Sequence, residues 1–473
     1  MVLFQSVEKF IQSEILKETE LELYFLEKPT KEQVQRLANQ LLKNVNLEKL
    51  QLMVNIFVDD SSFISDSISS LKNLKTLNVF INYNSVLGSI GVNNITKPIQ
   101  SLEYLKNLSL SFPSCKIEDN KLYELGTALS KCSNLVSLQI NFYNNSLGQL
   151  AVTSIFEDLN SLRSLDSLDL CFQHNKICIQ GCFSICKAIK NMTNLAKLKL
   201  NFNYNTIEDQ GLQYIAEAIS QLDKIIQIDI KADYNFISKK GLIDLNQSVS
   251  KLLKLEKLVY SLNGDQIGNG GFSSFLLLKE NKKIKDLCLS FNSIHIFKED
   301  ISQLGCLLSS LLNLIYLQLS FNSNKFKIEV LIELGKQIGQ SQSIQILNLN
   351  LANNQIQQED FIQFVEAISG CSNLREIFID SDFNNFGQGE IGQSQLGKAF
   401  SSYQQLQSIS LNLNFNQLVD KDIFDFSYEL KNCKNLLKIQ ISAQDNLLSN
   451  QCNYQTKVLL KKFRKLVSMG CLF

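Results

Sequence analysis

The sequence has no surplus of charge of either sign and no long apolar run. Lys plus Arg and Asp plus Glu number 46 each, so the formal net charge is zero. A chain balanced in this way creates no global positive potential that would attract nucleic acid. No run of eighteen apolar residues occurs, and residues 1–18 lack the basic flank, apolar stretch and cleavage site of a secretion signal. We therefore expect a cytoplasmic protein without a transmembrane segment, with a cytoskeletal or ciliary assembly as one candidate location.

Histidine is almost absent, and so are the motifs of common enzymes. The two histidines, His174 and His295, fall four repeats apart in the pattern described below, which is about 20 Å at the strand spacing of a sheet. They therefore cannot share a site. The sequence contains no kinase glycine loop, no His-Arg-Asp and no Asp-Phe-Gly motif. We predict that the protein is not an enzyme and holds no cofactor.

What the sequence does contain is a pattern that returns about every thirty residues. In Asn194–Ile207 it reads Leu-x-x-Leu-x-Leu-x-Phe-x-x-Asn-x-Ile. The alternation of Leu198 and Leu200 predicts a strand with one buried face, and the helical spacing of Leu212 and Ile215 predicts a short helix packed over it. Repeats of this kind stack into a solenoid. The second apolar position recurs about fifteen times, at Leu21, Leu50, Leu77, Leu108, Leu138, Leu168, Leu198, Ile228, Leu258, Leu287, Leu317, Leu347, Ile377, Ile409 and Ile439.

Most of these strands are followed by an asparagine at one fixed position. Its side-chain amide can bond the backbone of the turn where the strand ends and also reach a neighbouring repeat, which a buried loop requires. We interpret the series as a structural ladder and not as a binding site. Its members are Asn84, Asn145, Asn175, Asn205, Asn235, Asn324, Asn354, Asn384, Asn416 and Asn446, with Cys115 and Asp265 standing in.

With one strand and one full helix per repeat, residues 19–450 resemble a leucine-rich-repeat protein of the ribonuclease-inhibitor type. The resemblance implies an α/β fold, a leucine-rich-repeat solenoid shaped as a curved horseshoe, with about fifteen strand-helix units of about 30 residues. Strands stack about 4.8 Å apart and helices about 10 Å apart, so the parallel sheet should line the concave face. The repeat departs from the family in carrying two additional residues before the Asn, which add Phe202 and its equivalents to the inner strand face, so we expect longer strands. The composition, rich in Asn, Gln, Lys and Ile, resembles the large ciliate sets of such proteins.

Two end segments complete the predicted organisation. Residues 1–18 are expected to form an N-terminal helical cap, with Phe4, Val7 and Ile15 on one face. Residues 451–473 are expected to form a C-terminal cap with a basic amphipathic helix. Contact of this helix with an acidic partner or an anionic membrane surface stays open as an alternative.

Two kinds of side chain are candidates for binding on the concave face. The first kind consists of outward strand positions, which make a neutral, hydrogen-bonding face: Lys199, Asn201, Asp229, Lys231, Phe378 and Asp380. The second kind consists of aromatic residues six positions after the second apolar residue: His174, Tyr204, Tyr234, Phe383 and Phe415. Aromatic side chains are favoured interface anchors. The same position could instead turn inward and join the core, so both interpretations stay open.

Two short patterns resemble ligand sites and are interpreted as structural. Histidine and cysteine between His174 and Cys186 recur every four residues, like metal ligands. The repeat places Cys182 in the core and Cys178 at an exposed position, so we expect no metal site. The glycines of residues 387–397 match nucleotide-binding loops only weakly. We interpret them as a two-residue insertion in the loop of one repeat.

These patterns favour a non-catalytic scaffold, or a subunit of a larger assembly, that binds protein partners through the concave face and the loop rims. Nucleic acid would require a stripe of Lys and Arg with stacking aromatic residues, and the sequence has no such stripe. The resemblance also implies an alternative function, in which this protein regulates another enzyme, either as an inhibitor that wraps its target or as a GTPase activator.

Overall fold

The computed structural model of the chain describes residues 2–13, 18–56, 58–81, 87–120, 122–157, 159, 161–268, 270–388, 394–463 and 466–472. The chain forms two compact units, Met1–Phe236 and Ile237–Phe473. We call them unit 1 and unit 2.

The strands of unit 1 form one parallel layer in sequence order. Corresponding residues of neighbouring repeats pair directly, since Leu168 pairs with Leu198 and Leu198 with Ile228. A shift by one residue would turn these side chains from the core to solvent, so the apolar pattern determines the register. The strands are β1 (Val2–Phe4), β2 (Glu20–Tyr24), β3 (Lys49–Met53), β4 (Thr76–Phe80), β5 (Asn107–Ser111), β6 (Ser137–Asn141), β7 (Ser167–Cys171), β8 (Lys197–Asn201) and β9 (Gln227–Lys231).

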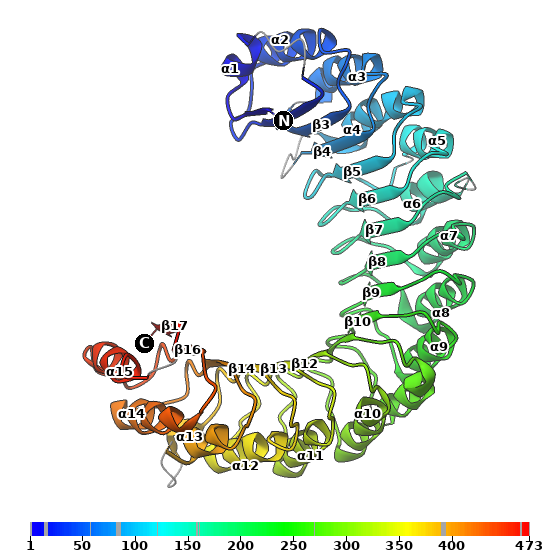
Figure 1. The fold of residues 1–473 in the computed structure, drawn as a ribbon. Coiled ribbons are helices and arrows are strands. Elements are labelled where there is room, and N and C mark those ends of the chain that lie inside the picture. Colours follow the sequence, from blue (N-terminus) through cyan, green and yellow to red (C-terminus); the bar gives the residue numbers. More distant parts are fainter. Residues whose placement is uncertain are drawn as a thin grey trace. The chain divides into compact units, whose positions relative to one another are not determined.

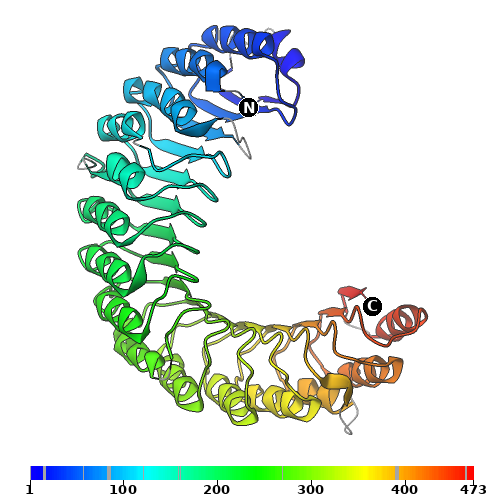
Figure 2. The same cartoon turned by 180° about the vertical axis from the view of Figure 1, so that it is seen from behind.

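The helices of unit 1 form a second layer that covers one face of the strands (Figures 1 and 2). Their apolar stripes are buried, and in α8 Leu212, Ile215 and Ile219 are at most 1% exposed. The opposite strand face lies on the inner side of the bend of this unit (Figure 1). The helices are α1 (Val7–Ile11), α2 (Lys31–Leu42), η1 (Val58–Asp60), α3 (Ser61–Ser70), α4 (Gly88–Thr96), η2 (Lys97–Ser101), α5 (Tyr123–Lys131), α6 (Gln149–Phe156), α7 (Ile179–Ile189) and α8 (Glu208–Ile219).

Unit 2 has the same two layers, with its helices again on the outer side (Figure 2). Its parallel strands are β10 (Lys257–Ser261), β11 (Asp286–Ser290), β12 (Tyr316–Ser320), β13 (Ile346–Asn350), β14 (Glu376–Asp380), β15 (Ser408–Asn412), β16 (Lys438–Ser442) and β17 (Ser468–Leu472). Its helices are α9 (Lys239–Val249), η3 (Gly271–Glu280), α10 (Lys298–Ser310), α11 (Ile328–Gly339), α12 (Gln358–Ile368), η4 (Phe386–Gln388), α13 (Ser394–Ser401), α14 (Asp420–Glu429), η5 (Leu430–Asn432) and α15 (Cys452–Leu460). In the described ranges no helix is both long enough and apolar enough to cross a bilayer.

The apolar positions predicted from the repeat are strand residues throughout. Every member of the series from Leu21 to Ile439 is the second residue of one of the strands β2–β16, and every one is buried. The expected α/β solenoid, with its parallel sheet on the concave side, is therefore confirmed within each unit. Each of these strands spans five residues, and the expectation of strands longer than in the family's usual repeat stays a prediction. Phe202 follows the end of β8 and still points inward, where its ring stacks on Phe172 at 6.0 Å.

The asparagine ladder is structural, as predicted. The Nδ2 of Asn205 donates to the carbonyl of Phe172 in the preceding repeat at 2.9 Å, and its Oδ1 accepts from the N–H of Ile177 at 2.8 Å. Nδ2 also donates to the carbonyl of Phe202 in its own repeat at 2.9 Å, so one buried amide satisfies backbone groups of two repeats. At Cys115 the thiol takes over part of this role by donating to a carbonyl of the preceding repeat at 3.1 Å. Asn84 lies outside the described residues.

The two end segments differ from the predicted helices. The chain first forms β1, which pairs with β2, and within the described residues 2–13 the helix α1 spans five residues. At the other end α15 stops at Leu460 and β17 follows, paired with β16. Segments this short fit the helical and the strand period equally well, so periodicity could not separate them. Ile15, Arg464 and Lys465 lie outside the described residues, and the division at residues 18 and 450 stays a prediction.

Candidate protein-binding surfaces

A left-handed turn follows the strands β5 to β16, and in most of these turns it sends one side chain outward. The residue six positions after the second strand residue has a φ of 54° at His174, 55° at Tyr204 and 55° at Tyr234. Its backbone N–H is held by the next repeat, as in the bond from Tyr204 to the carbonyl of Asp233 at 2.8 Å. The backbone is therefore pinned to the sheet while the side chain projects from the rim.

In unit 1 these side chains form a continuous aromatic stack. The rings of His174 and Tyr204 are 4.2 Å apart and inclined by 9°, and those of Tyr204 and Tyr234 are 4.7 Å apart and inclined by 15°. Tyr204 is 42% exposed and Tyr234 43%, so the core interpretation of this position is wrong. Burial of part of the ring raises the pKa of Tyr204, and its neighbours Tyr234 and Asp233 add to the effect.

The charged strand positions of unit 1 lie beside this stack and compensate one another. Lys199 of β8 is paired with Asp229 of β9 in the sheet register, and its Nζ lies 3.8 Å from Asp169 on β7. Burial raises the pKa of Asp169, while Lys199 and Lys231 act in the opposite direction. Asn201 donates from Nδ2 to a side-chain oxygen of the neighbouring repeat at 3.1 Å. All the predicted residues of unit 1 therefore lie on three adjacent repeats.

The sequence pattern missed the residues that extend this surface. Tyr143 contacts His174 edge to face, with ring centroids 5.7 Å apart. It also lines an open cleft of about 570 Å³ together with Phe80, Ser111, Pro113, Asn141, Cys171 and Gln173. Tyr143 lies one position before the turn residue of its repeat, so a comparison of the turn residues alone does not include it. Burial raises the pKa of Cys171, which favours the neutral thiol over the reactive thiolate.

Unit 2 carries a second, smaller aromatic pair. The rings of Phe383 and Phe415 are 4.1 Å apart and inclined by 8°, and the side chains are 55% and 42% exposed. Both residues are in the left-handed turn position, with φ of 53° and 56°. Here too the core interpretation is wrong. Asp380 lies at the end of β14, three residues before Phe383.

A small cleft opens on the strand face beside Asp380. It has a volume of about 240 Å³ and is lined by Phe378, Ser410, Leu411, Asn412, Gln440, Ile441, Ser442, Gly470 and Leu472. Phe378 is 38% exposed and Leu472 60%, so apolar side chains form part of its wall. The predicted residues therefore fall into two groups, one on each unit.

Comparisons with known proteins give two structures of low similarity. No protein-family model matches the sequence, and no curated protein matches it. Among solved structures, the TLR13–ssRNA13 complex aligns at 16% identity over 96% of this chain and 65% of that chain, with a TM-score of 0.48. This chain thus spans less than two thirds of that one. The Rad7–Elc1 complex of yeast aligns at 14% identity over 93% and 88% of the two chains, with a TM-score of 0.42. Values this low carry no information on function.

Each unit is a leucine-rich-repeat solenoid. The repeat, the parallel register and the asparagine ladder establish this fold by themselves. Each solenoid unit therefore offers three surfaces, the strand face, the rim of turns and the outer helix layer.

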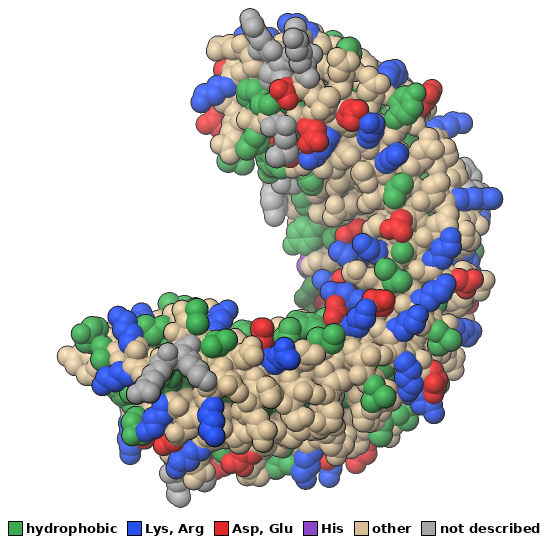
Figure 3. Space-filling model, viewed as in Figure 1, with side chains coloured by type: hydrophobic (Ala, Val, Ile, Leu, Met, Phe, Trp, Pro, Cys, Tyr) green, Lys and Arg blue, Asp and Glu red, His purple; other side chains and the backbone are tan. Residues whose placement is uncertain are grey.

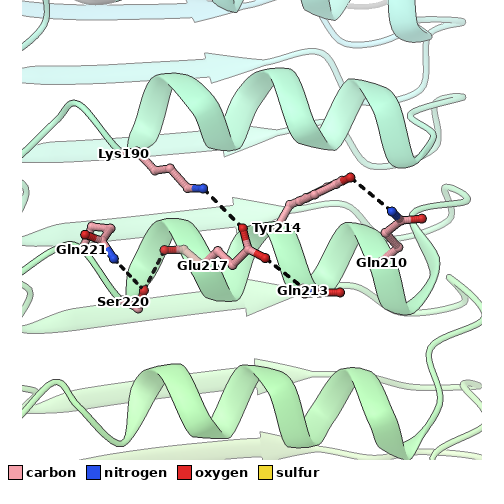
Figure 4. A network of polar contacts seen from close by, with 7 residues as sticks. All are labelled: Lys190, Gln210, Gln213, Tyr214, Glu217, Ser220 and Gln221. Carbon is pink, nitrogen blue, oxygen red and sulfur yellow. Dashed lines mark hydrogen bonds and ion pairs between the residues drawn. The ribbon is translucent and has the colours of Figure 1, made fainter.

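The outer helix layer of unit 1 carries a polar network whose members bond one another (Figure 4). The Nζ of Lys190 lies 3.4 Å from a carboxylate oxygen of Glu217, and Gln213 donates to the other at 3.2 Å. Ser220 donates to the carbonyl of Glu217 at 2.8 Å, and Gln221 donates to Ser220 at 3.2 Å. Since these groups satisfy one another at the surface, we interpret the network as a solvated helix face.

The two ligand-like sequence patterns have structural explanations. Cys182 is fully buried and donates to a helix carbonyl at 3.3 Å, whereas Cys178 is half-buried outside the core. The described part of the chain contains no cluster of three or more His, Cys, Asp and Glu suited to a metal ion. Gly387 is needed for packing, because a Cβ there would lie 2.0 Å from the carbonyl oxygen of Gln417. Residues 389–393 of the glycine-rich loop lie outside the described residues.

Proposed function

We propose that this protein is a non-catalytic binding protein that holds protein partners on its strand face and turn rim, as a scaffold or a subunit of a larger assembly. The observation that carries the proposal is the set of aromatic side chains in the left-handed turn position: His174, Tyr204, Tyr234, Phe383 and Phe415.

Stability alone does not favour aromatic residues at this position. A residue other than glycine in the left-handed region carries about 1–3 kcal/mol of strain, least for Asn. Neighbouring repeats indeed have Asn144 and Asn353 at the same position, with the same φ of 54°. The exposed rings gain little from burial, and stacking returns only about 0.5–1.5 kcal/mol per pair. Large aromatic anchors at this rim therefore point to binding, because such side chains dominate protein interfaces.

The geometry supports a protein partner over nucleic acid. Bases bind by stacking on free aromatic faces within a positively charged groove. Here the faces already cover one another, with centroids 4.2 Å apart for His174 and Tyr204, so mainly ring edges are presented. Lys and Arg side chains are interspersed with Asp and Glu on the face shown in Figure 3, and Lys199 lies 3.8 Å from Asp169. Such a mixed surface suits a polar and aromatic protein interface.

The cysteines support a location in a reducing compartment, which we propose is the cytoplasm. All twelve are free. Burial raises the pKa of Cys132 and of Cys433 to about 12, so these thiols are protonated core residues. A secreted chain of this kind would be expected to use some cysteines in disulfides. We also propose that the repeat is of the ribonuclease-inhibitor type, because most repeats carry a helix of two to three turns.

The test uses turn-position variants that the fold already accommodates. Tyr204→Asn with Tyr234→Asn places at both turns the residue found at Asn144. Wild-type and variant full-length protein are immobilised at equal density, and the proteins retained from a native lysate are quantified by mass spectrometry. We expect the amount of each specific partner retained by the variant to be at least tenfold lower than the amount retained by the wild type.

The matched control is Tyr104→Asn, which removes a tyrosine that is 60% exposed in a turn away from the rim. It should retain the partners of the wild type. Equal retention by the wild type, the control and the rim variant would refute the proposal for unit 1.

A further inference from the structure

We propose that the aromatic rim of unit 2 binds a basic segment of a partner protein, with an Arg or Lys placed against Asp380, Asp382 and the stacked phenylalanines and a neighbouring apolar side chain in the cleft beside Phe378. This inference rests on the proposed function and specifies the chemistry of one partner. We call this site the acidic-aromatic site; it comprises Phe378, Asp380, Asp382, Phe383 and Phe415.

Hydrogen bonds hold the two carboxylates in place but bring no positive charge. Asp380 accepts from the N–H of Asp382 at 3.3 Å. Asp382 in turn accepts from Nδ2 of Asn412 at 3.0 Å and from the N–H of Asn414 at 3.0 Å. Neither aspartate forms an ion pair with any of the described residues. Two oriented anions are therefore left with neutral donors only.

The electrostatics of the site favour the binding of a positively charged group. Burial raises the pKa of both Asp380 and Asp382, and the charge of Asp380 adds to the effect at Asp382. Burial removes water from the ionised carboxylates, and an incoming positive charge would offset that loss. The equivalent face of unit 1 differs, because there Lys199 and Lys231 already act on Asp169.

The surrounding apolar groups favour a basic protein segment over other cations as the ligand. Phe383 directly follows Asp382, so a guanidinium or ammonium bonded to the carboxylate lies within reach of an aromatic ring, a favourable arrangement. The cleft of about 240 Å³ beside Asp380 has room for an apolar side chain. Its floor is open at Gly470, where a Cβ would come no closer than 3.4 Å to another group. Nucleic acid is disfavoured, because its phosphates would face two carboxylates.

The structure supplies variants that remove the charge without disturbing the fold. Asp380 and Asp382 correspond to Asn412 and Asn414 in the next repeat, so Asp380→Asn with Asp382→Asn installs residues already present at equivalent positions. Phe383→Asn with Phe415→Asn installs the residue of the preceding repeat, Asn353, which has the same left-handed turn. The charge-matched control is Glu329→Gln with Glu366→Gln, two exposed acids on helices of the same unit.

The experiment pans a library of random dodecapeptides on the immobilised full-length protein and measures the recovered peptides by fluorescence polarisation. We expect sequences that combine Arg or Lys with Leu or Phe. Their affinity should fall at least tenfold on the Asp380→Asn, Asp382→Asn variant and on the Phe383→Asn, Phe415→Asn variant, and should weaken as salt is raised. The Glu329→Gln, Glu366→Gln control should bind like the wild type.

Three results would overturn the inference. These are recovery of no peptide, recovery of peptides without basic residues, and equal affinity for the wild type and the Asp380→Asn, Asp382→Asn variant. Binding of Ca²⁺ alone to the wild type but not to that variant would reassign the carboxylates to a metal and also overturn it. The proposed function is judged separately, because partners lost on Tyr204→Asn with Tyr234→Asn would still support binding through unit 1.

Discussion

At the scale of single residues, the left-handed turn position determines what the rim presents. In Asn144 and Asn353 the short amide relaxes the turn and reaches the neighbouring repeat, where it donates to Ser114 at 2.8 Å and Ser323 at 2.9 Å. An aromatic residue at the same position has a less favourable backbone and gains a stacking contact instead. The strain of about 1–3 kcal/mol and the stacking energy of about 0.5–1.5 kcal/mol are similar in size, so they nearly cancel.

This balance predicts that the rim aromatics matter little for stability. We expect Tyr204→Asn with Tyr234→Asn to change the free energy of unfolding by less than about 1 kcal/mol, because lost stacking is offset by relief of backbone strain. Urea unfolding followed by circular dichroism measures this. For comparison, Phe202→Ala in the core should lower it by about 3–5 kcal/mol. A loss above 2 kcal/mol in the rim variant would mean that the stack is a structural element.

The paired carboxyls of unit 2 predict a pH dependence with a definite sign. The pKa of Asp380 and of Asp382 is raised above the ordinary value of 3.8, first by burial. The folded state then binds more protons than the unfolded state, so these groups reduce stability as pH rises from 3.8 through their folded pKa. We expect the Asp380→Asn, Asp382→Asn variant to gain stability relative to the wild type over that range. Urea unfolding at successive pH values tests this, and a constant difference would contradict it.

At the scale of elements, the sequence predicts the strands well and the rim poorly. The strand register follows from the apolar period, since a slip would expose Leu198 and its equivalents. The direction of the rim side chains depends on the sign of one φ angle, and an aromatic such as Tyr204 does not indicate a positive φ as Gly or Asn would. The sequence does not reveal the strand Val2–Phe4, because three residues are too short to show a period. In Ser468–Leu472 the two apolar positions of the repeat are occupied by Met469 and Cys471, which weakens the pattern. Likewise Gly271–Glu280 is a 3₁₀ helix, a distinction that apolar spacing does not make.

Close packing between helices gives the element-scale prediction. Gly126 lies inside α5, where a Cβ would be 2.2 Å from the carbonyl oxygen of Ser154 on α6. Helix propensity alone favours Ala over Gly by about 1 kcal/mol, whereas overpacking typically costs about 1–3 kcal/mol. We expect Gly126→Ala to lower the free energy of unfolding by about 1–2 kcal/mol. Thr127→Ala, at an exposed position of the same helix, should have no such effect. Unchanged or raised stability in Gly126→Ala would show that the two helices can separate without loss.

At the scale of the whole molecule, the chain carries two chemically different surfaces on separate units. Unit 1 presents a stack of His174 and two tyrosines beside compensated charges. Unit 2 presents two phenylalanines beside uncompensated carboxylates. Different chemistry favours different partners, which is expected of a scaffold and not of an inhibitor that wraps one target. The sequence could supply the residues of both surfaces but not this distinction, because the pairing of Lys199 with Asp169 joins neighbouring repeats in space.

A scaffold of this kind should co-migrate with its partners when a native lysate is fractionated. We expect the untagged protein, fractionated from a native lysate of its source cells, to migrate well above its mass of 53.7 kDa. Tyr204→Asn with Tyr234→Asn and Asp380→Asn with Asp382→Asn should each remove a different set of co-migrating proteins, because each acts on one surface only. Migration of the wild type as a monomer would contradict the scaffold and favour transient regulation of an enzyme instead. If both variants lost the same proteins, a single partner would have to contact both units.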